Sequence, residues 1–328
     1  MRPVGIFSTG MYVPERIVTN FDLEKTLDIS DEWISEKVGV RQRRIAAPDQ
    51  ATSDLAIAAA RAALDRAGMS PLDIDLIVLA TSSPDVIQPS TAAIVQGKLG
   101  VMNAAAFDVS AICSGSVYAL DVAVGMMQSH RSFDNVLVIG AETYSRILDW
   151  SDRTTCVYFG DGAGAAVLTD VAQSHGFLGS LLGTDGTHWD VIIFLGGGSR
   201  YPASHDTVEA GLHRFQMEGP KVWTFATTIV PKAIKEALAT HNLNPQNADF
   251  LISHQANINI IKANMAALNL PMSKTHTCLE RFGNTSGASV LLALSEALEL
   301  GKISRGDIVV LVGFGGGLAW GVSIWRWM

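Results

Sequence analysis

Three short segments place reactive or polar side chains where a strand pattern gives way to a helix pattern. Cys113 follows the strand-like run 106–109 and precedes a long helical pattern. His254 follows the apolar run 250–253, and Asn284 lies in a glycine-flanked turn before a helix of small residues. Ligands bind at the carboxyl ends of strands in open α/β sheets, so the three side chains are candidates for one site.

The cysteine is suited to nucleophilic chemistry, because a helix dipole and free backbone N–H groups favour a thiolate. Ser114, Gly115 and Ser116 leave room there for a ligand to approach. The alternative is a buried, inert cysteine, the commoner fate of a single one. Taken alone, His254 also fits a structural histidine, and Asn284 fits a turn or cap residue.

Other catalytic motifs are missing from the sequence. It contains no G-x-S-x-G elbow, no G-x-x-x-x-G-K-[ST] phosphate loop and no H-E-x-x-H metal motif. The glycine-rich run 313–317 lacks the spacing of a dinucleotide fingerprint and precedes a strand pattern instead of a helix. The three cysteines, Cys113, Cys156 and Cys278, are too few for a disulfide framework and lack zinc-type spacing. We therefore expect no bound metal.

The composition indicates a folded, acidic protein with a large core. A chain of 328 residues is long for one core, since domains cluster at about 100–150 residues, so we expect two packed halves. Hydrophobic residues make up 48% and charged residues 17%, which excludes a disordered chain. The net charge of -8 argues against nucleic-acid or membrane partners. We find no secretory or membrane-spanning pattern and expect a cytoplasmic protein.

Short apolar runs alternate with helical patterns along the chain. We expect strands at 4–8, 75–80, 106–109, 136–140, 165–169, 250–253, 308–312 and 318–325, and helices at 53–67, 91–99, 115–128, 222–240, 258–268 and 287–299. This alternation predicts an α/β protein with a largely parallel sheet covered on both faces. The pattern repeats about Val171, which predicts two similar halves, 1–170 and 171–328. The segment 183–215 is expected to be a loop-rich excursion near a substrate entrance.

The segments also resemble the β-ketoacyl-acyl-carrier-protein synthase III family. D-V-S-A-I-C-S-G, S-H-Q-A-N, F-G-N-T-S-G-A-S and G-F-G-G-G-L-A-W-G follow one another as in that family, and the likeness spans nearly the whole chain. The resemblance implies a thiolase-like five-layered αβαβα fold of two similar halves. It also implies a homodimer with no permanently bound cofactor.

The resemblance implies a catalytic triad of Cys113, His254 and Asn284. The cysteine takes an acyl group from acyl-CoA as a thioester. A malonyl thioester on acyl-carrier protein then loses carbon dioxide, while the histidine and asparagine stabilise the enolate. By the same resemblance, backbone N–H groups of Cys113 and Gly316 are expected to form the oxyanion hole of the condensation. Retention of all three side chains argues against a catalytically inactive scaffold.

Further residues match substrate contacts of the family. Trp33 is expected to stack on the adenine of coenzyme A, and Arg153 matches a cofactor-side arginine. Lys37 stands where an arginine is typical, and keeps the charge without the bidentate fork. Asn257 and Phe314 complete the expected substrate-binding set.

Gln88 stands where many family members carry an aromatic residue that shapes the acyl pocket across the dimer. A polar residue there favours an unusual, polar or dicarboxylic acyl group. Asn259 replaces an arginine, and Thr224, Ala266 and Ala267 stand where lysine is usual, so the patch that docks the acidic carrier protein is thinned. Three hypotheses remain open: initiation of fatty-acid synthesis, condensation in a specialised pathway, and acyl transfer to oxygen or nitrogen without decarboxylation.

Overall fold

Two sheets form the centre of the molecule. The computed structural model describes residues 2–328. The first sheet has the order β1-β7-β6-β4-β5 and contains β1 (Val4–Tyr12), β4 (Leu76–Ala80), β5 (Ala105–Val109), β6 (Val136–Glu142) and β7 (Gly162–Asp170). The second has the order β11-β12-β13-β8 and contains β8 (Gly176–Thr184), β11 (Phe250–Ser253), β12 (Ile308–Gly315) and β13 (Ala319–Arg326).

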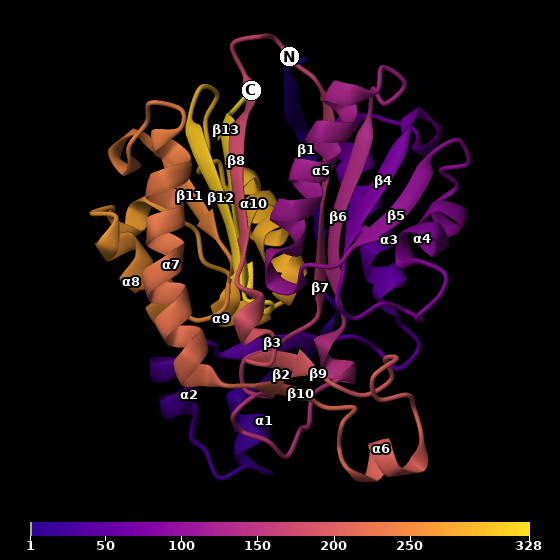
Figure 1. Cartoon of the computed structure of the whole chain (residues 1–328), viewed down its shortest axis with the longest axis vertical. Helices are drawn as coiled ribbons and strands as arrows, with labels where there is room; N and C mark the ends of the chain where they lie inside the picture. Colours follow the sequence, from indigo (N-terminus) through magenta and orange to yellow (C-terminus); the bar gives the residue numbers. More distant parts are fainter. Residues whose placement is uncertain (1) are drawn as a thin grey trace.

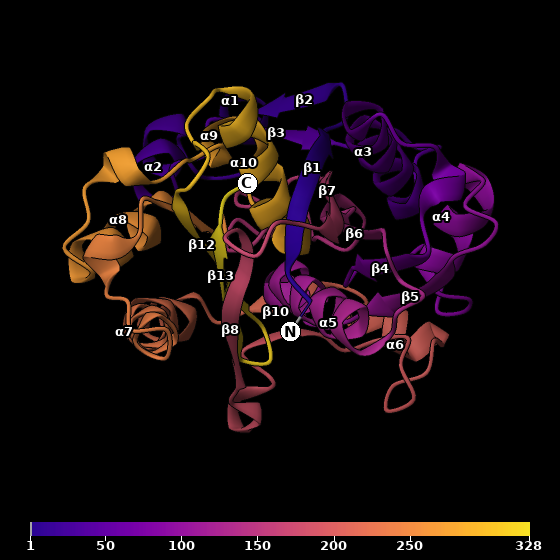
Figure 2. The same ribbon diagram turned by 90° about the horizontal axis from the view of Figure 1, so that it is seen from above.

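Helices separate and cover the two sheets, which makes five layers (Figures 1 and 2). The central layer contains α5 (Gly115–Ser129) and α10 (Ser289–Glu299). The outer layers contain α3 (Thr52–Ala67) and α4 (Thr91–Leu99) on the first sheet, and α7 (Gly219–Ala239) and α8 (Ile258–Ala267) on the second. The αβαβα fold predicted from the sequence is confirmed. The expected division of the chain after residue 170 stays a prediction.

Both faces of each sheet are buried, which explains the uninterrupted apolar runs in the sequence. In β4, Leu76 and Val78 pack toward the central helices, whereas Ile77 and Leu79 pack toward α3 and α4. Such a strand has no solvated face, so it shows no alternation of polar and apolar residues. The layers are thus held by apolar packing on every side of the sheets.

The expectation of a largely parallel sheet is wrong. The pairs β4–β5, β4–β6 and β11–β12 are parallel, whereas β1–β7, β6–β7, β12–β13 and β13–β8 are antiparallel. A tight turn at residues 316–318 joins β12 to β13, and antiparallel neighbours need only such a turn. The sequence pattern detected the strands but not the direction of their neighbours.

Several short elements at the carboxyl ends of the strands were not predicted. They are β2 (Arg16–Thr19), β3 (Gln42–Ile45), β9 (Ile192–Phe194), β10 (Phe215–Met217), α1 (Asn20–Glu24), α2 (Asp31–Lys37), α6 (His205–Glu209) and α9 (Leu279–Phe282). Most of them lie below the two sheets in Figure 1. The excursion 183–215 therefore contains a strand and a helix, and β9 pairs with β10. Within residues 2–328, no helix is long and apolar enough to cross a membrane.

Candidate active site

Cys113 lies in a 3-10 turn, Ile112–Ser114, between β5 and α5. Ile112 has a φ of +46°, which is rare for a β-branched residue and holds the turn in a tight, strained form. The cysteine is only 5% exposed. A Cβ on Gly315 would lie 2.9 Å from its Sγ, so β12 passes the sulfur at a distance that only glycine permits.

His254 lies directly after β11 and is buried. Its backbone N–H donates to Val312 O at 2.7 Å, which ties it to the neighbouring strand β12. Nδ1 is 2.6 Å from Ser289 Oγ at the start of α10, and Phe314 packs edge-on to the ring. Burial lowers the pKa of His254 to about 3, so the imidazole is neutral. Because Nδ1 is engaged, Nε2 is the nitrogen left for a ligand.

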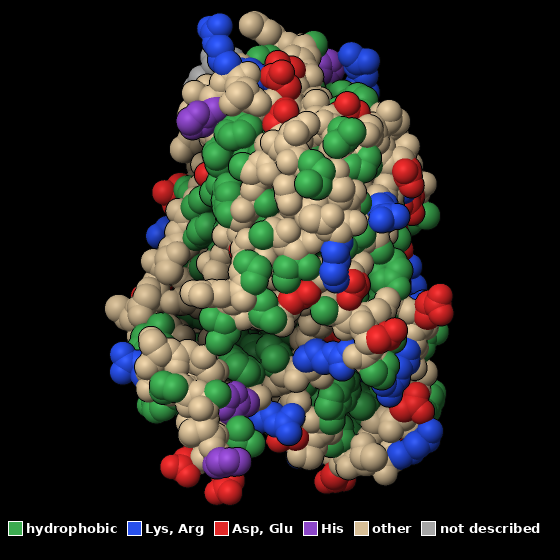
Figure 3. All heavy atoms as spheres, turned by 90° about the vertical axis from the view of Figure 1, so that its right-hand side faces the viewer, with side chains coloured by type: hydrophobic (Ala, Val, Ile, Leu, Met, Phe, Trp, Pro, Cys, Tyr) green, Lys and Arg blue, Asp and Glu red, His purple; other side chains and the backbone are tan. Residues whose placement is uncertain are grey.

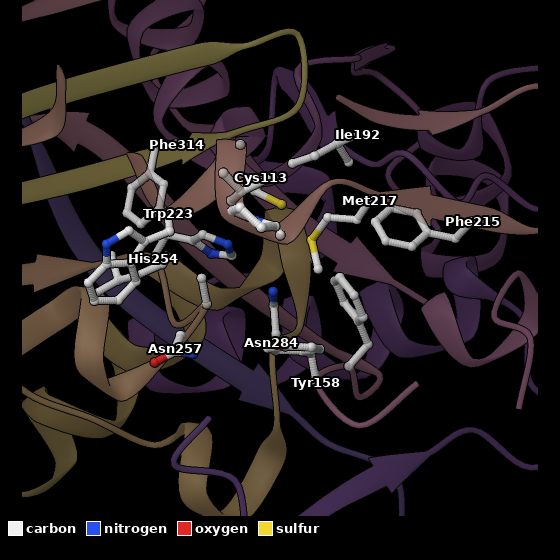
Figure 4. A pocket seen from close by; sticks show the side chains of 17 residues that line it. Cys113, Tyr158, Ile192, Phe215, Met217, Trp223, His254, Asn257, Asn284 and Phe314 are labelled. Carbon is white, nitrogen blue, oxygen red and sulfur yellow. The ribbon is translucent and has the colours of Figure 1, made fainter. Parts of the chain in front are cut away.

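Asn284 is held by its backbone and by one end of its side chain. Its N–H donates to Tyr158 O at 2.8 Å, and its carbonyl accepts from Gly160 N at 3.0 Å. The side-chain Oδ1 accepts from Ser286 N at 2.8 Å. The amide NH2 group is therefore the end available to a substrate, and Figure 4 shows it directed toward Cys113.

One cavity of about 320 Å³ contains Cys113, His254 and Asn284. The three side chains come from three elements far apart in sequence and project into the same space (Figure 4). Most of the remaining wall is apolar and comes from Tyr158, Phe159, Ile192, Phe215, Met217, Pro220, Val222, Trp223, Ala256, Ile260 and Phe314. The sequence-predicted residues Asn257 and Phe314 also line this cavity.

The expectation of a thiolate at Cys113 is wrong for the resting site. The pKa of the thiol is raised to about 12, chiefly by burial and in smaller part by the nearby Glu142 carboxylate. The hydrogen bond with Ser286 and the backbone N–H groups of Cys113 and Gly316 lower the pKa, but burial outweighs them. The sulfur thus faces the two predicted oxyanion-hole donors as a neutral thiol. For the sulfur to act as a nucleophile, the thiol proton has to leave as the sulfur forms its bond to the substrate.

A second cavity of about 620 Å³ adjoins the first and shares Tyr158, Met217, Gly219 and Pro220 with it. Trp33 and Arg153 both line this outer cavity. Trp33 is 43% exposed, as expected of a ring that a ligand can cover. The shared residues place the outer cavity directly beside the cavity that contains Cys113.

Two predicted substrate-binding residues lie outside both cavities. The carbonyl of Lys37 accepts a bond from Asn257 Nδ2 at 2.8 Å, so Lys37 connects α2 to the start of α8. Gln88 lies on an exposed loop between β4 and α4. Its expected role, across a dimer, stays a prediction.

The sequence did not identify part of the cavity wall or one buried acid. Ile192 lies on β9, and Phe215 and Met217 lie on β10, in a region with no clear periodicity. Glu142 is the polar residue that ends the apolar strand β6, just as His254 is the polar residue that follows the apolar strand β11. The pattern that indicated His254 could therefore have indicated Glu142 as well. In residues 2–328, no three His, Cys, Asp or Glu side chains are grouped to hold a metal ion.

The fold and the site define a class of protein. Two sheets around shared helices, with a cysteine opening one of those helices, characterise the thiolase-type condensing enzymes, which are acyltransferases. The sequence model of 3-oxoacyl-[acyl-carrier-protein] synthase III matches residues 107–186, and that of its C-terminal part matches residues 238–327. The chain belongs to this family, also called β-ketoacyl-acyl-carrier-protein synthase III, and is a condensing enzyme.

Full-length relatives support this assignment. The synthases III of Caldanaerobacter subterraneus subsp. tengcongensis and Clostridioides difficile are 51% and 49% identical, over 98% of this chain and 97% and 98% of theirs. The crystal structure from Thermus thermophilus matches with a TM-score of 0.92 at 41% identity, covering 99% of both chains. The priming β-ketosynthase of the R1128 polyketide pathway matches with a TM-score of 0.91 at 33% identity, over 99% and 97%.

Proposed function

We propose that this enzyme transfers a short acyl group from acyl-CoA to Cys113 and condenses it with malonyl-acyl-carrier protein, releasing carbon dioxide. The reaction starts fatty-acid synthesis. The observation that carries the proposal is one apolar cavity in which a cysteine thiol, a neutral imidazole and an amide converge, next to an outer cavity lined by Trp33 and Arg153. Coenzyme A occupies the outer cavity, and the acyl thioester reaches the inner one.

Acyl transfer uses the sulfur and the backbone around it. Cys113 Sγ attacks the thioester carbonyl, and the N–H groups of Cys113 and Gly316 hold the negative oxygen of the tetrahedral intermediate. The apolar wall excludes water, which protects the acyl-enzyme from hydrolysis. Both N–H groups already act on the sulfur, so the carbonyl oxygen of an acyl group bound there would lie within their reach.

Decarboxylation uses the other two side chains. His254 is neutral and donates through Nε2, while Asn284 donates through its amide. Both groups lie where the malonyl thioester carbonyl becomes an enolate, and neither has to give up a proton. The carbanion then attacks the acyl group on Cys113, and the cysteine leaves as the product forms.

The test is carbon dioxide release from malonyl-carrier protein and malonyl-CoA, each mixed with a panel of acyl-CoAs. Release that requires both an acyl-CoA and Cys113 supports the proposal, and Cys113→Ala should abolish it. An acylated Cys113 without carbon dioxide release would contradict condensation and favour acyl transfer to oxygen or nitrogen.

A second candidate is a specialised condensing enzyme that uses malonyl-CoA or a rarely used acyl group. Thr224, Ala266 and Ala267 are exposed and uncharged, which weakens a surface for an acidic carrier protein. Asn259 is uncharged where the family usually carries an arginine. Its side-chain amide donates to the carbonyls of Glu36 and Lys37. Faster carbon dioxide release with malonyl-CoA than with malonyl-carrier protein would favour this candidate.

We infer that the enzyme acts as a homodimer in the cytoplasm. Strand β5 is a sheet edge, and the loop before α4 exposes Val86 by 47% and Ile87 by 82%. On the side of the molecule that carries α4, hydrophobic side chains border a hollow (Figure 3). A dimer would cover these residues and bring Gln88 to a partner. Light scattering should give twice the chain mass, and Ile87→Asp should shift it toward the monomer.

A further inference from the structure

A carboxylate that the proposed reaction does not use lies buried close to the nucleophile. Glu142, the last residue of β6, has no exposed surface. Its oxygens accept hydrogen bonds from hydroxyl groups: Ser83 Oγ at 2.5 Å, Ser82 Oγ at 2.8 Å and Thr81 Oγ1 at 3.3 Å. A buried carboxylate without a cationic partner is expensive, so its retention so near Cys113 calls for a use.

A series of neighbouring hydroxyl groups lies between this carboxylate and the sulfur. Ser82 Oγ bonds both Glu142 and the Tyr144 hydroxyl, the latter at 2.9 Å. The side chain of Ser286 lies close to the Tyr144 hydroxyl. Ser286 Oγ lies 3.4 Å from Cys113 Sγ. Each of the three intermediate groups is a hydroxyl, which can donate and accept at once, so a proton can pass along the series.

The surrounding structure fixes this arrangement. Ser286 has a φ of +45°, an unusual conformation for a residue other than glycine. A Cβ on Gly287 would lie 2.9 Å from the Glu142 carboxylate, so this position has room only for glycine. The Tyr144 ring stacks on Phe159 at 5.0 Å, which fixes where its hydroxyl points.

Building on the proposed acyl transfer, we propose that Glu142 holds the thiol proton of Cys113 while that cysteine is acylated. The hydroxyls of Ser286, Tyr144 and Ser82 carry the proton in both directions. Glu142 thus acts on Cys113 only through these hydroxyl groups, and it touches no substrate atom.

The step balances without a further reagent. As Sγ bonds the acyl carbon, the S–H bond breaks, each hydroxyl passes on one proton, and the carboxylate becomes a carboxylic acid. Coenzyme A leaves as a thiolate with the electrons of the broken C–S bond and takes a proton from water. In the condensation, Cys113 leaves as a thiolate and recovers its proton from Glu142.

A separate proton acceptor resolves a conflict in the site. His254 has to present an N–H to the enolate, and burial keeps its pKa too low for it to accept the thiol proton. Burial raises the pKa of Glu142 to about 7, so this acid can both accept and return a proton near neutral pH. The titratable groups that act on it are Cys113, before α5, and Tyr144, after β6. From the segment after β4 and from the turn before α10 it meets hydroxyl and backbone N–H groups.

The test is single-turnover release of coenzyme A from acetyl-CoA between pH 5.5 and 9. In the unchanged protein, the rate should rise with pH through about 7, because only the ionised carboxylate accepts the proton. Glu142→Gln and Tyr144→Phe should each slow acylation about 100-fold at pH 8 and remove this inflection. Tyr118→Phe removes a hydroxyl of α5 that bonds Gly183 O, outside the series, and should change neither.

Glu142→Gln with the rate and pH profile of the unchanged protein would overturn the proposal, as would an unaffected Tyr144→Phe. If Glu142→Gln does not fold, as judged by thermal unfolding, Tyr144→Phe and Ser82→Ala decide the question in the same way. An unchanged protein that releases no coenzyme A from any acyl-CoA would instead contradict the proposed acyl transfer itself.

Discussion

At the scale of single residues, glycines in β12 decide how close the strand comes to the nucleophile. A Cβ on Gly315 would lie 2.6 Å from Cys113 Cβ and 2.9 Å from its Sγ. Both distances are shorter than real contacts between such atoms. The strand can therefore bring the N–H of Gly316 to the sulfur only because residue 315 has no side chain.

Gly315→Ala should displace Cys113 and reduce the acylation rate by about 100-fold, since a shift near 1 Å is enough for such a loss. Acylation can be followed by mass spectrometry after mixing with acyl-CoA. The matched control is Gly97→Ala, because an added Cβ there meets open space. Gly301 also has open space, but its positive φ would strain an alanine, so it is the poorer control. An unchanged acylation rate in Gly315→Ala would contradict the close approach.

The two hydrogen-bond donors should act in the second half-reaction. His254→Ala and Asn284→Ala should lower malonyl decarboxylation far more than acylation of Cys113, because they hold the enolate and not the attacking sulfur. Removing one such donor reduces turnover by about 100- to 1,000-fold. Separate measurement of acyl-enzyme formation and carbon dioxide release checks this. Equal losses in both steps would contradict the assigned roles.

Residue types and order were enough to predict which side chains meet, but not their ionisation. Cys113, His254 and Asn284 each lie beside a strand end or a tight turn, and the fold brings such places together. The raised pKa of Cys113 depends chiefly on burial by neighbours distant in sequence. Glu142 was missed because a lone acid after an apolar strand is also compatible with a surface position.

At the scale of elements, short helices position the outer cavity. Helix α2 begins after Ser30, whose Oγ accepts the backbone N–H of Trp33 at 3.1 Å. This cap fixes the first turn, and Trp33 is in that turn. The orientation of the indole thus depends on one side-chain hydrogen bond.

Ser30→Ala should lower the free energy of unfolding by about 1 kcal/mol or less, because α2 is short and peripheral. The stronger effect should be a severalfold higher KM for acyl-CoA with a nearly unchanged kcat. Steady-state kinetics at saturating malonyl thioester measure both constants. Ser70→Ala removes a similar cap far from the cavity and is the control. A fall in kcat without a change in KM would contradict this role.

Long periodic elements were predictable, and irregular ones were not. The helix 91–99 and the strand 250–253 were placed at their observed bounds, since each is a continuous run with clear ends. Strand β8 was missed because glycines interrupt its apolar residues. Strands β9 and β10 have three residues each, too few for a pattern, although they form part of the cavity wall.

At the scale of the whole molecule, an ionic cluster joins α10 in the central layer to α9 and to the segment before α9. Glu296 on α10 accepts from His276 at 2.7 Å and from both terminal nitrogens of Arg281 at 2.6 Å. Burial alone would raise the pKa of Glu296, but the bonds from His276 and Arg281 outweigh it and lower the pKa to about 2.

Glu296→Gln should lower the free energy of unfolding at pH 7 by about 3 kcal/mol, at the low end for a buried ion pair because Arg281 is partly exposed. The folded pKa lies below the unfolded one, so this stability is present above about pH 4.5 and is lost as the pH falls toward 2. Urea unfolding between pH 7 and 3 should therefore show a smaller acid loss in Glu296→Gln. Parallel losses in both proteins would contradict the cluster.

The two central helices begin in the same way. In each half a three-residue 3-10 turn precedes the helix, and its first residue has nearly the same positive φ: +46° at Ile112 and +45° at Ser286. The second residue is Cys113 in one half and Gly287 in the other. The molecule is thus pseudosymmetric at its centre, with a nucleophile in one copy and a side-chain-free position in the other. Divergence at this pair of positions gives a repeated framework a single reaction centre.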